Sequence, residues 1–103
     1  MAPRTLITAA VAGMLGCAGP QPEAEVESVT ALEAGVQRVT VIVHNRRGHG
    51  QVDLEVTLSG RSGRRIRASH PVELRGHEDV ELAIDIPAPA DHYTADVTAE
   101  YPN

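Results

Sequence analysis

Apolar and polar residues alternate along four segments in the C-terminal two-thirds of this chain. These segments are residues 39–44, 52–59, 80–86 and 93–101. A period of two is typical of strands that have one face in a core and the other in water. No stretch after residue 17 keeps a comparable helical period. The pattern therefore predicts an all-β domain.

Turn-forming residues separate the alternating segments. They gather at residues 45–50, 59–63 and 75–78, and Pro87 and Pro89 end the strand before them. Short strands at this spacing predict an antiparallel immunoglobulin-like sandwich of about six or seven strands. We expect residues 36–45 and 51–59 to form a hairpin, with the 46–50 and 60–64 loops at opposite ends of the sheet.

The N-terminal segment has the features of an export signal. One positive charge, Arg4, precedes an apolar run from Leu6 to Leu15. This run is shorter than the roughly 20 residues that a membrane-spanning helix needs, and it fits the apolar region of a signal peptide, which implies a helical signal peptide before the sandwich.

The sequence Met14-Leu15-Gly16-Cys17 resembles a bacterial lipoprotein signal. The resemblance implies cleavage after Gly16 and acylation of Cys17, with palmitate among the attached lipids. The protein would then be anchored in the cell envelope, and Ala18 implies the outer membrane, facing the periplasm, in a cell with two membranes. Two alternatives stay open: Gly16 and Ala18 could form an ordinary secretory cleavage site, giving a secreted protein, or the segment could be retained.

Under the lipoprotein interpretation the chain has three parts. Residues 1–16 are the signal peptide, residues 17–27 are the lipidated cysteine and an acidic tether, and residues 28–103 are the sandwich. Pro20 and Pro22 favour extended backbone in the tether, and its glutamates keep it solvated.

Composition limits both the core and the partners. Phe and Trp are absent, so the core must be aliphatic, and the single cysteine cannot form an internal disulfide. The chain has 14 acidic residues against nine arginines and no lysine. An acidic chain lacks the basic footprint of a nucleic-acid binder, so no nucleic acid is expected.

The strands also resemble a known family. VTVIVHNRRGHGQVDLEVTLSG, PVELRGHEDVELAIDIPAP and HYTADVTAEYP are similar to small bacterial immunoglobulin-like domains of the cell-adhesion-related and FxLYD-like kinds. The match is carried by Asn45, Leu74, Gly76, Glu78, Tyr93 and Val97. The resemblance implies a tyrosine corner at Tyr93, with Ala95 where an antibody domain has its second cysteine. It does not supply a function.

Two groups of residues are candidates for binding. His44 and His49 flank the expected hairpin and could form a weak metal site; the alternative is that these histidines are simply exposed. Arg61, Arg64, Arg65 and Arg67 form the densest arginine group and could bind a small ligand or a polyanion. The alternative is solvated charge on an edge strand that discourages aggregation.

No residue pattern indicates catalysis. The serines lack the context of a nucleophile elbow, and no glycine-rich phosphate cradle precedes a helix. We therefore expect a non-catalytic lipoprotein without a cofactor, held to the membrane by its lipid, that binds another envelope protein by pairing along a sheet edge. The alternatives are a ligand-, polyanion- or metal-binding lipoprotein and a structural protein without a defined ligand.

Overall fold

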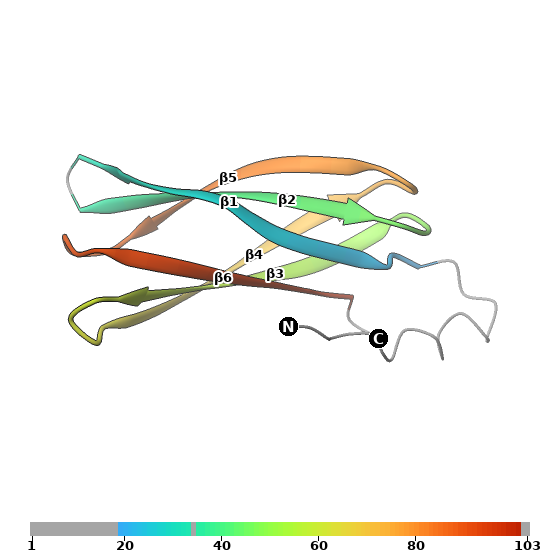
Figure 1. The fold of residues 1–103 in the computed structure, drawn as a ribbon. Helices are drawn as coiled ribbons and strands as arrows, with labels where there is room; N and C mark the ends of the chain where they lie inside the picture. The colour runs from blue at the N-terminus through green and yellow to red at the C-terminus, as the bar shows by residue number, and fades with distance from the viewer. Residues whose placement is uncertain (1–18, 34, 102–103) are drawn as a thin grey trace.

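Residues 19–33 and 35–101, the part of the chain that the computed structural model describes, form six antiparallel strands in two sheets (Figure 1). The strands are β1 (Pro22–Leu32), β2 (Val36–Asn45), β3 (Gly50–Gly60), β4 (Arg65–Leu74), β5 (Asp79–Pro87) and β6 (Tyr93–Glu100). Sheet A has the order β1-β2-β5, and sheet B has the order β4-β3-β6. These are the orders of strands A-B-E and C′-C-F in an immunoglobulin-type sandwich. The all-β sandwich expected from the sequence is confirmed.

The core lies between the two central strands. Alternate residues of β2 and β3 are completely buried, and β5 adds Ile84 and Ile86. The fully buried side chains are Val39, Val41, Val43, Val52, Leu54, Val56, Leu58 and Leu74. Each contributes about 1.5–3 kcal/mol as an upper estimate. The inward residues of the outer strands are mostly half-buried because each outer strand has a neighbour on one side only.

The expected hairpin of residues 36–45 and 51–59 is wrong. β2 pairs with β1 and β5, whereas β3 pairs with β4 and β6, so the connection 46–49 passes from one sheet to the other. The alternation is the same in both arrangements, because it records only which face of a strand is buried. Each of the two strands instead pairs with a different neighbour in the chain, β2 with the preceding β1 and β3 with the following β4.

The tether expected at residues 17–27 differs from the structure. Residues 22–27 belong to β1, which pairs with β2 from Pro22↔Asn45 to Leu32↔Val36. Residues 19–21 also contact the domain, since the amides of Arg46 and Gly48 donate to the carbonyls of Gln21 and Gly19. Residues 1–18, with the expected signal peptide and Cys17, lie outside the described residues.

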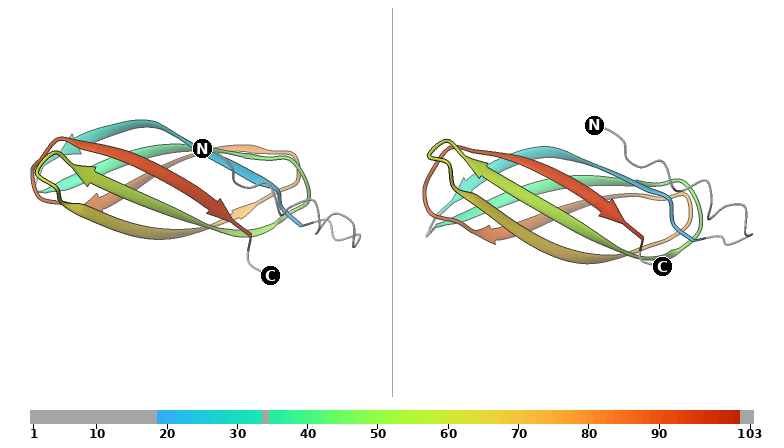
Figure 2. Two further views of the ribbon diagram at one scale, coloured as in Figure 1. Left: turned by 60° about the horizontal axis from the view of Figure 1, so that its bottom comes forward. Right: turned by 90° about the horizontal axis from the view of Figure 1, so that it is seen from below.

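The two flanks of the sandwich differ. β1 and β6 lie side by side along one flank, whereas β4 and β5 come close to each other much less on the other (Figures 1 and 2). The part of the chain that the structure describes holds no helix with the length and hydropathy to cross a membrane.

Candidate functional site

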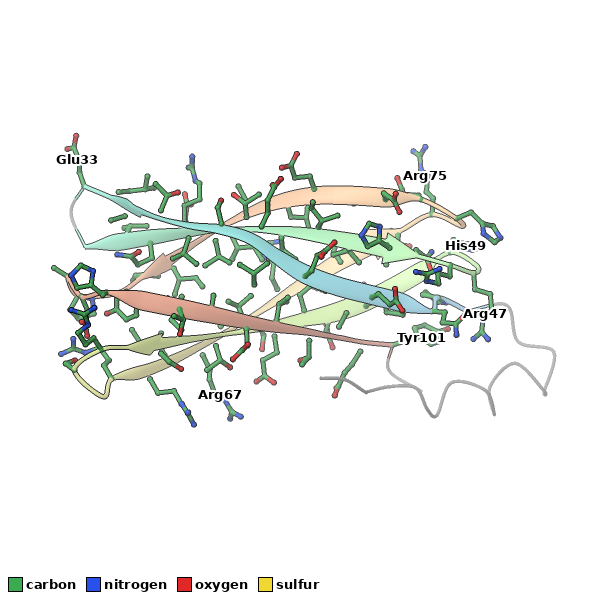
Figure 3. All side chains as sticks on the ribbon, in the orientation of Figure 1. Glu33, Arg47, His49, Arg67, Arg75 and Tyr101 are labelled. Carbon is green, nitrogen blue, oxygen red and sulfur yellow. The ribbon has the colours of Figure 1, made fainter. Side chains whose placement is uncertain are left out.

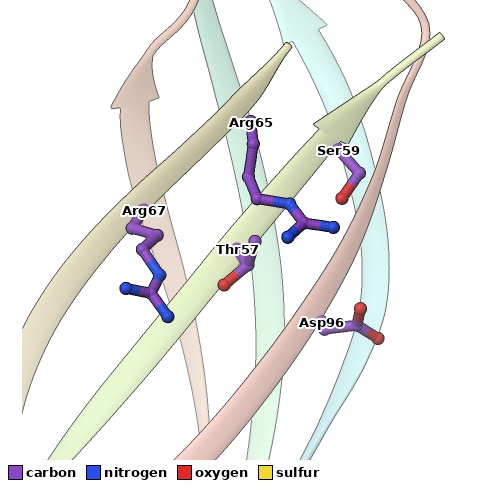
Figure 4. Close-up of a pocket in the computed structure, with 5 residues that line it drawn as sticks. All are labelled: Thr57, Ser59, Arg65, Arg67 and Asp96. Carbon is purple, nitrogen blue, oxygen red and sulfur yellow. The ribbon is translucent and has the colours of Figure 1, made fainter. Parts of the chain in front are cut away.

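A shallow trough crosses the outer face of sheet B. It holds about 660 Å³. Its lining residues are Thr57 and Ser59 of β3, Arg65 and Arg67 of β4, and Asp96 of β6 (Figure 4). All five side chains point outward because they alternate with the buried residues of the same strands.

The strand register places these side chains in two rows across the sheet. One row runs from Arg67 through Thr57 to Asp96, and the other brings Arg65 next to Ser59. The guanidinium group of Arg65 extends over β3 between the hydroxyl groups of Thr57 and Ser59 (Figure 4). The trough therefore presents two cations along one side, hydroxyl groups in the middle and a carboxylate on the other side.

The cations of the trough have little internal compensation. Arg67 Nε lies 4.0 Å from Glu55 Oε2, with both side chains well exposed. Among the described residues, no carboxylate lies within 4.0 Å of the guanidinium group of Arg65. Exposed ion pairs at such distances are weak, so both guanidinium groups are available to bind an external anion.

A second hollow of about 350 Å³ adjoins the trough at Ser59. Arg61, His92 and Tyr93 contribute to its lining. The hydroxyl of Tyr93 donates a hydrogen bond to the carbonyl of Pro89 at 2.5 Å. This bond holds the connection before β6 against the strand.

Asp91 organises this end of the sandwich. Its Oδ2 accepts a hydrogen bond from the hydroxyl of Ser62 at 2.6 Å, and its Oδ1 accepts one from the backbone amide of His92 at 2.7 Å. Both hydrogen bonds lower the pKa of Asp91, and the bond from Ser62 has the larger effect. Arg64 lies 3.9 Å from the same carboxylate. A side chain at Gly60 would come too close to Asp91 Oδ2, so a larger residue here would require the Asp91 side chain to shift.

The four predicted arginines thus divide into three roles. Arg65 and Arg67 line the trough, Arg61 lines the adjoining hollow, and Arg64 contacts Asp91. These arginines could be predicted from the sequence because they lie close together in the chain. Thr57, Ser59 and Asp96 could not be predicted, because only the pairing of β3 with β4 and β6 brings them beside Arg65 and Arg67.

The outer face of sheet A is acidic by contrast. Its carboxylates come from Glu23, Glu25 and Glu27 on β1 and from Asp79, Glu81 and Asp85 on β5. Arg38 forms a bidentate pair with Asp85 at 2.7 and 3.0 Å, which raises the pKa of Arg38 and lowers that of Asp85. Arg46 pairs with Glu23 at 2.7 Å.

Glu27 and Glu81 are the uncompensated carboxylates of this face. A hydrogen bond to Glu81 and the charge of Glu81 raise the pKa of Glu27. Within the described residues neither carboxylate has a cationic partner within 4.0 Å. The middle of sheet A therefore carries unbalanced negative charge.

His44, one of the two candidates for a metal site, lies between two carboxylates of sheet A. His44 Nε2 lies 3.1 Å from Glu25 Oε2 and His44 Nδ1 lies 2.9 Å from Asp79 Oδ1, so both ring nitrogens face carboxylates of sheet A. The hydrogen bond to Glu25, followed by that to Asp79, raises the pKa of His44. His49 is exposed in the connection between the sheets, and no cluster suited to a metal occurs in residues 19–33 and 35–101.

Asn45 joins three segments at the end of the sandwich opposite the β3–β4 turn. Its Oδ1 accepts hydrogen bonds from the backbone amides of Gln21 at 3.0 Å and Arg47 at 3.3 Å. Its Nδ2 donates to the carbonyls of Gly48 at 2.9 Å and Arg75 at 2.6 Å. Asn45 is only 3% exposed, and its amide thus attaches the segment before β1 to two connections. Arg47, His49, Arg75 and Tyr101 gather at this end (Figure 3).

Comparisons with family models, with curated proteins and with solved structures found no match.

Proposed function

We propose that this chain is a non-catalytic, lipid-anchored interaction module of the bacterial cell envelope, which binds an extended segment of another envelope protein along the outer edge of β5. The observation that carries the proposal is that β5, whose one proline is its last residue, is the outer strand without a bulge, an internal proline or another described strand along its outer edge. The proposal includes the relationship with bacterial immunoglobulin-like domains, which is supported by the strand order and by the bond from Tyr93 to Pro89.

The other three outer strands carry features that discourage pairing. β1 starts at Pro22 and has a bulge between Val26 and Ser28. β4 contains Pro71, which cannot donate a backbone hydrogen bond, and β6 lies against β1. Prolines, bulges and covering segments are the usual means of protecting a sheet edge. β5 pairs with β2 from Val36↔Pro87 to His44↔Asp79 without a register shift, and no other described strand pairs with its outer edge.

The side chains of β5 define the chemistry of the partner. Val80 and Leu82 point toward the core and are half-buried at the more open flank, so an added strand would bury apolar residues at alternate positions. Asp79, Glu81 and Asp85 point outward, and Glu81 has no cationic partner within 4.0 Å among the residues that the structure describes. We therefore expect arginine or lysine at the intervening positions of the partner.

The anchor would hold the domain close to the membrane. Residues 19–21 are docked on the 46–48 connection, so only Ala18 would separate an acylated Cys17 from the folded part. The end that carries Asn45 would then face the bilayer, and β5 would extend away from it. A Cys17→Ser variant should lose membrane association in cell fractionation, whereas retention in the membrane would contradict the anchor.

Site-specific photocrosslinking in cells tests the β5 edge. A photoreactive residue replaces Ala83 on β5 or, as a matched control, Thr98 on β6; both are exposed on outer strands. We expect a crosslink from position 83 to a segment with alternating basic and apolar residues. Glu81→Arg should abolish it, and Glu100→Arg, the same charge change on β6, should not. No crosslink from position 83, or equal crosslinks from both positions, would contradict the proposal.

A further inference from the structure

The trough on sheet B is separate from the β5 edge and has its own recognition chemistry. Arg65 and Arg67 are two residues apart on one strand face, so their backbones are separated by about 6.6–6.8 Å. Guanidinium groups bind carboxylates through paired hydrogen bonds. A row of two such groups matches a ligand that carries carboxylates in succession.

The rest of the trough is suited to hydroxyl groups. Thr57 and Ser59 can each donate and accept, and Asp96 accepts only. In the described residues Asp96 has no ion-pair partner within 4.0 Å, so its oxygens are available to a ligand. A highly charged polyphosphate would be repelled by Asp96, whereas a sugar hydroxyl can donate to it. The arrangement therefore favours a ligand with both carboxylates and hydroxyl groups.

The shape of the trough favours a polymer over a small molecule. Sites for small molecules are usually concave pockets that surround most of the ligand. This trough is open and continues at Ser59 into the hollow lined by Arg61 and Tyr93. A chain could lie across both depressions and contact a third guanidinium group at Arg61.

We propose that the trough of Thr57, Ser59, Arg65, Arg67 and Asp96 binds a carboxylate-bearing polysaccharide of the polyuronate type. The guanidinium groups hold the carboxylates of successive sugars, and Asp96 accepts hydrogen bonds from sugar hydroxyls. The β3–β4 turn beside the trough lies at the opposite end of β3 from the 46–49 connection. This inference does not depend on the β5 edge or on Cys17.

Calorimetric titration of the full chain with polygalacturonate fragments tests the proposal, with dextran as the neutral polymer. The double variant R65A/R67A should weaken binding by about tenfold or more, since each arginine makes charge-assisted hydrogen bonds. The control R38A/R46A removes the same charge from sheet A and should change affinity by less than about threefold. All four arginines are at the surface, and circular dichroism verifies that each variant is folded.

Asp96→Ala separates specific recognition from attraction between charges. If the trough only attracted polyanions, the loss of a negative charge would strengthen binding. We expect the opposite, a decrease in affinity of about threefold or more, because Asp96 accepts hydrogen bonds from sugar hydroxyls. Stronger binding by Asp96→Ala, equal losses in the two double variants, or no binding by the unaltered chain would overturn the proposal.

Discussion

Replacement of Asn45 by alanine should destabilise the sandwich more than the loss of a small polar side chain suggests. Four hydrogen bonds of the Asn45 amide hold the segment before β1, the 46–49 connection and the turn after β4. Alanine keeps none of them and leaves the partly buried amide of Gln21 and two carbonyls without their partner. Each lost bond costs about 0.5–1.5 kcal/mol, and an unsatisfied buried group costs about 1–3 kcal/mol.

The expected loss for Asn45→Ala is about 2–4 kcal/mol in the free energy of unfolding, because water can reach part of the junction. For a domain of this size each kcal/mol corresponds to about 4–8 °C, so Tm should fall by about 8–32 °C. Urea unfolding of the full chain measures the free energy. The control Gln51→Ala, at an exposed position near the start of β3, should stay within about 0.5 kcal/mol.

Asn45→Asp tests which half of the amide matters. Aspartate keeps the oxygen that accepts from Gln21 and Arg47 but places a second oxygen against the carbonyls of Gly48 and Arg75. At neutral pH this variant should be as unstable as Asn45→Ala, and it should partly recover in acid, where a protonated carboxyl can donate. A loss below about 0.5 kcal/mol for Asn45→Ala would refute the reasoning, because the junction would then not need these bonds.

Three further expectations follow from local geometry and charge. His77 has φ 55°, in the left-handed region, so His77→Gly should raise the free energy of unfolding by up to about 1 kcal/mol in urea; a decrease would mean that the imidazole has stabilising contacts. The pKa of His44 is raised, chiefly by its hydrogen bond to Glu25, so its stabilising effect is full below the unfolded pKa and is lost as pH rises through the folded pKa. His44→Ala should therefore cost more stability at about pH 5.5 than at about pH 8.5, and equal costs would contradict the ion-pair account. The raised pKa of Glu27 means that its ionised form is disfavoured beside Glu81, so Glu27→Gln should stabilise the chain at neutral pH and lose this effect in acid; an effect independent of pH would point to another cause.

Local patterns in the sequence were sufficient to predict the buried faces of the alternating strands and the positions where most strands end. Alternation placed Val39, Val41 and Val43 on a buried face, and the structure confirms this. Such a prediction succeeds because the pleat couples the side-chain period to burial within one strand. Turn residues marked the ends of the strands for an equally local reason, since they depend on the backbone preferences of a few neighbouring residues.

The pairing of the strands, and the side chains that it makes neighbours, could not be predicted from the sequence. Residues 22–27 resemble a solvated tether in sequence, yet they form half of β1 because the backbone of β2 offers them partners. Asp96 and Arg67 are far apart in the chain, and the strand register places them in one row, on either side of Thr57. Alternation records that one face of a strand is buried but not against which strand. Pairing depends on backbone hydrogen bonds and packing between distant segments, and these leave no local pattern.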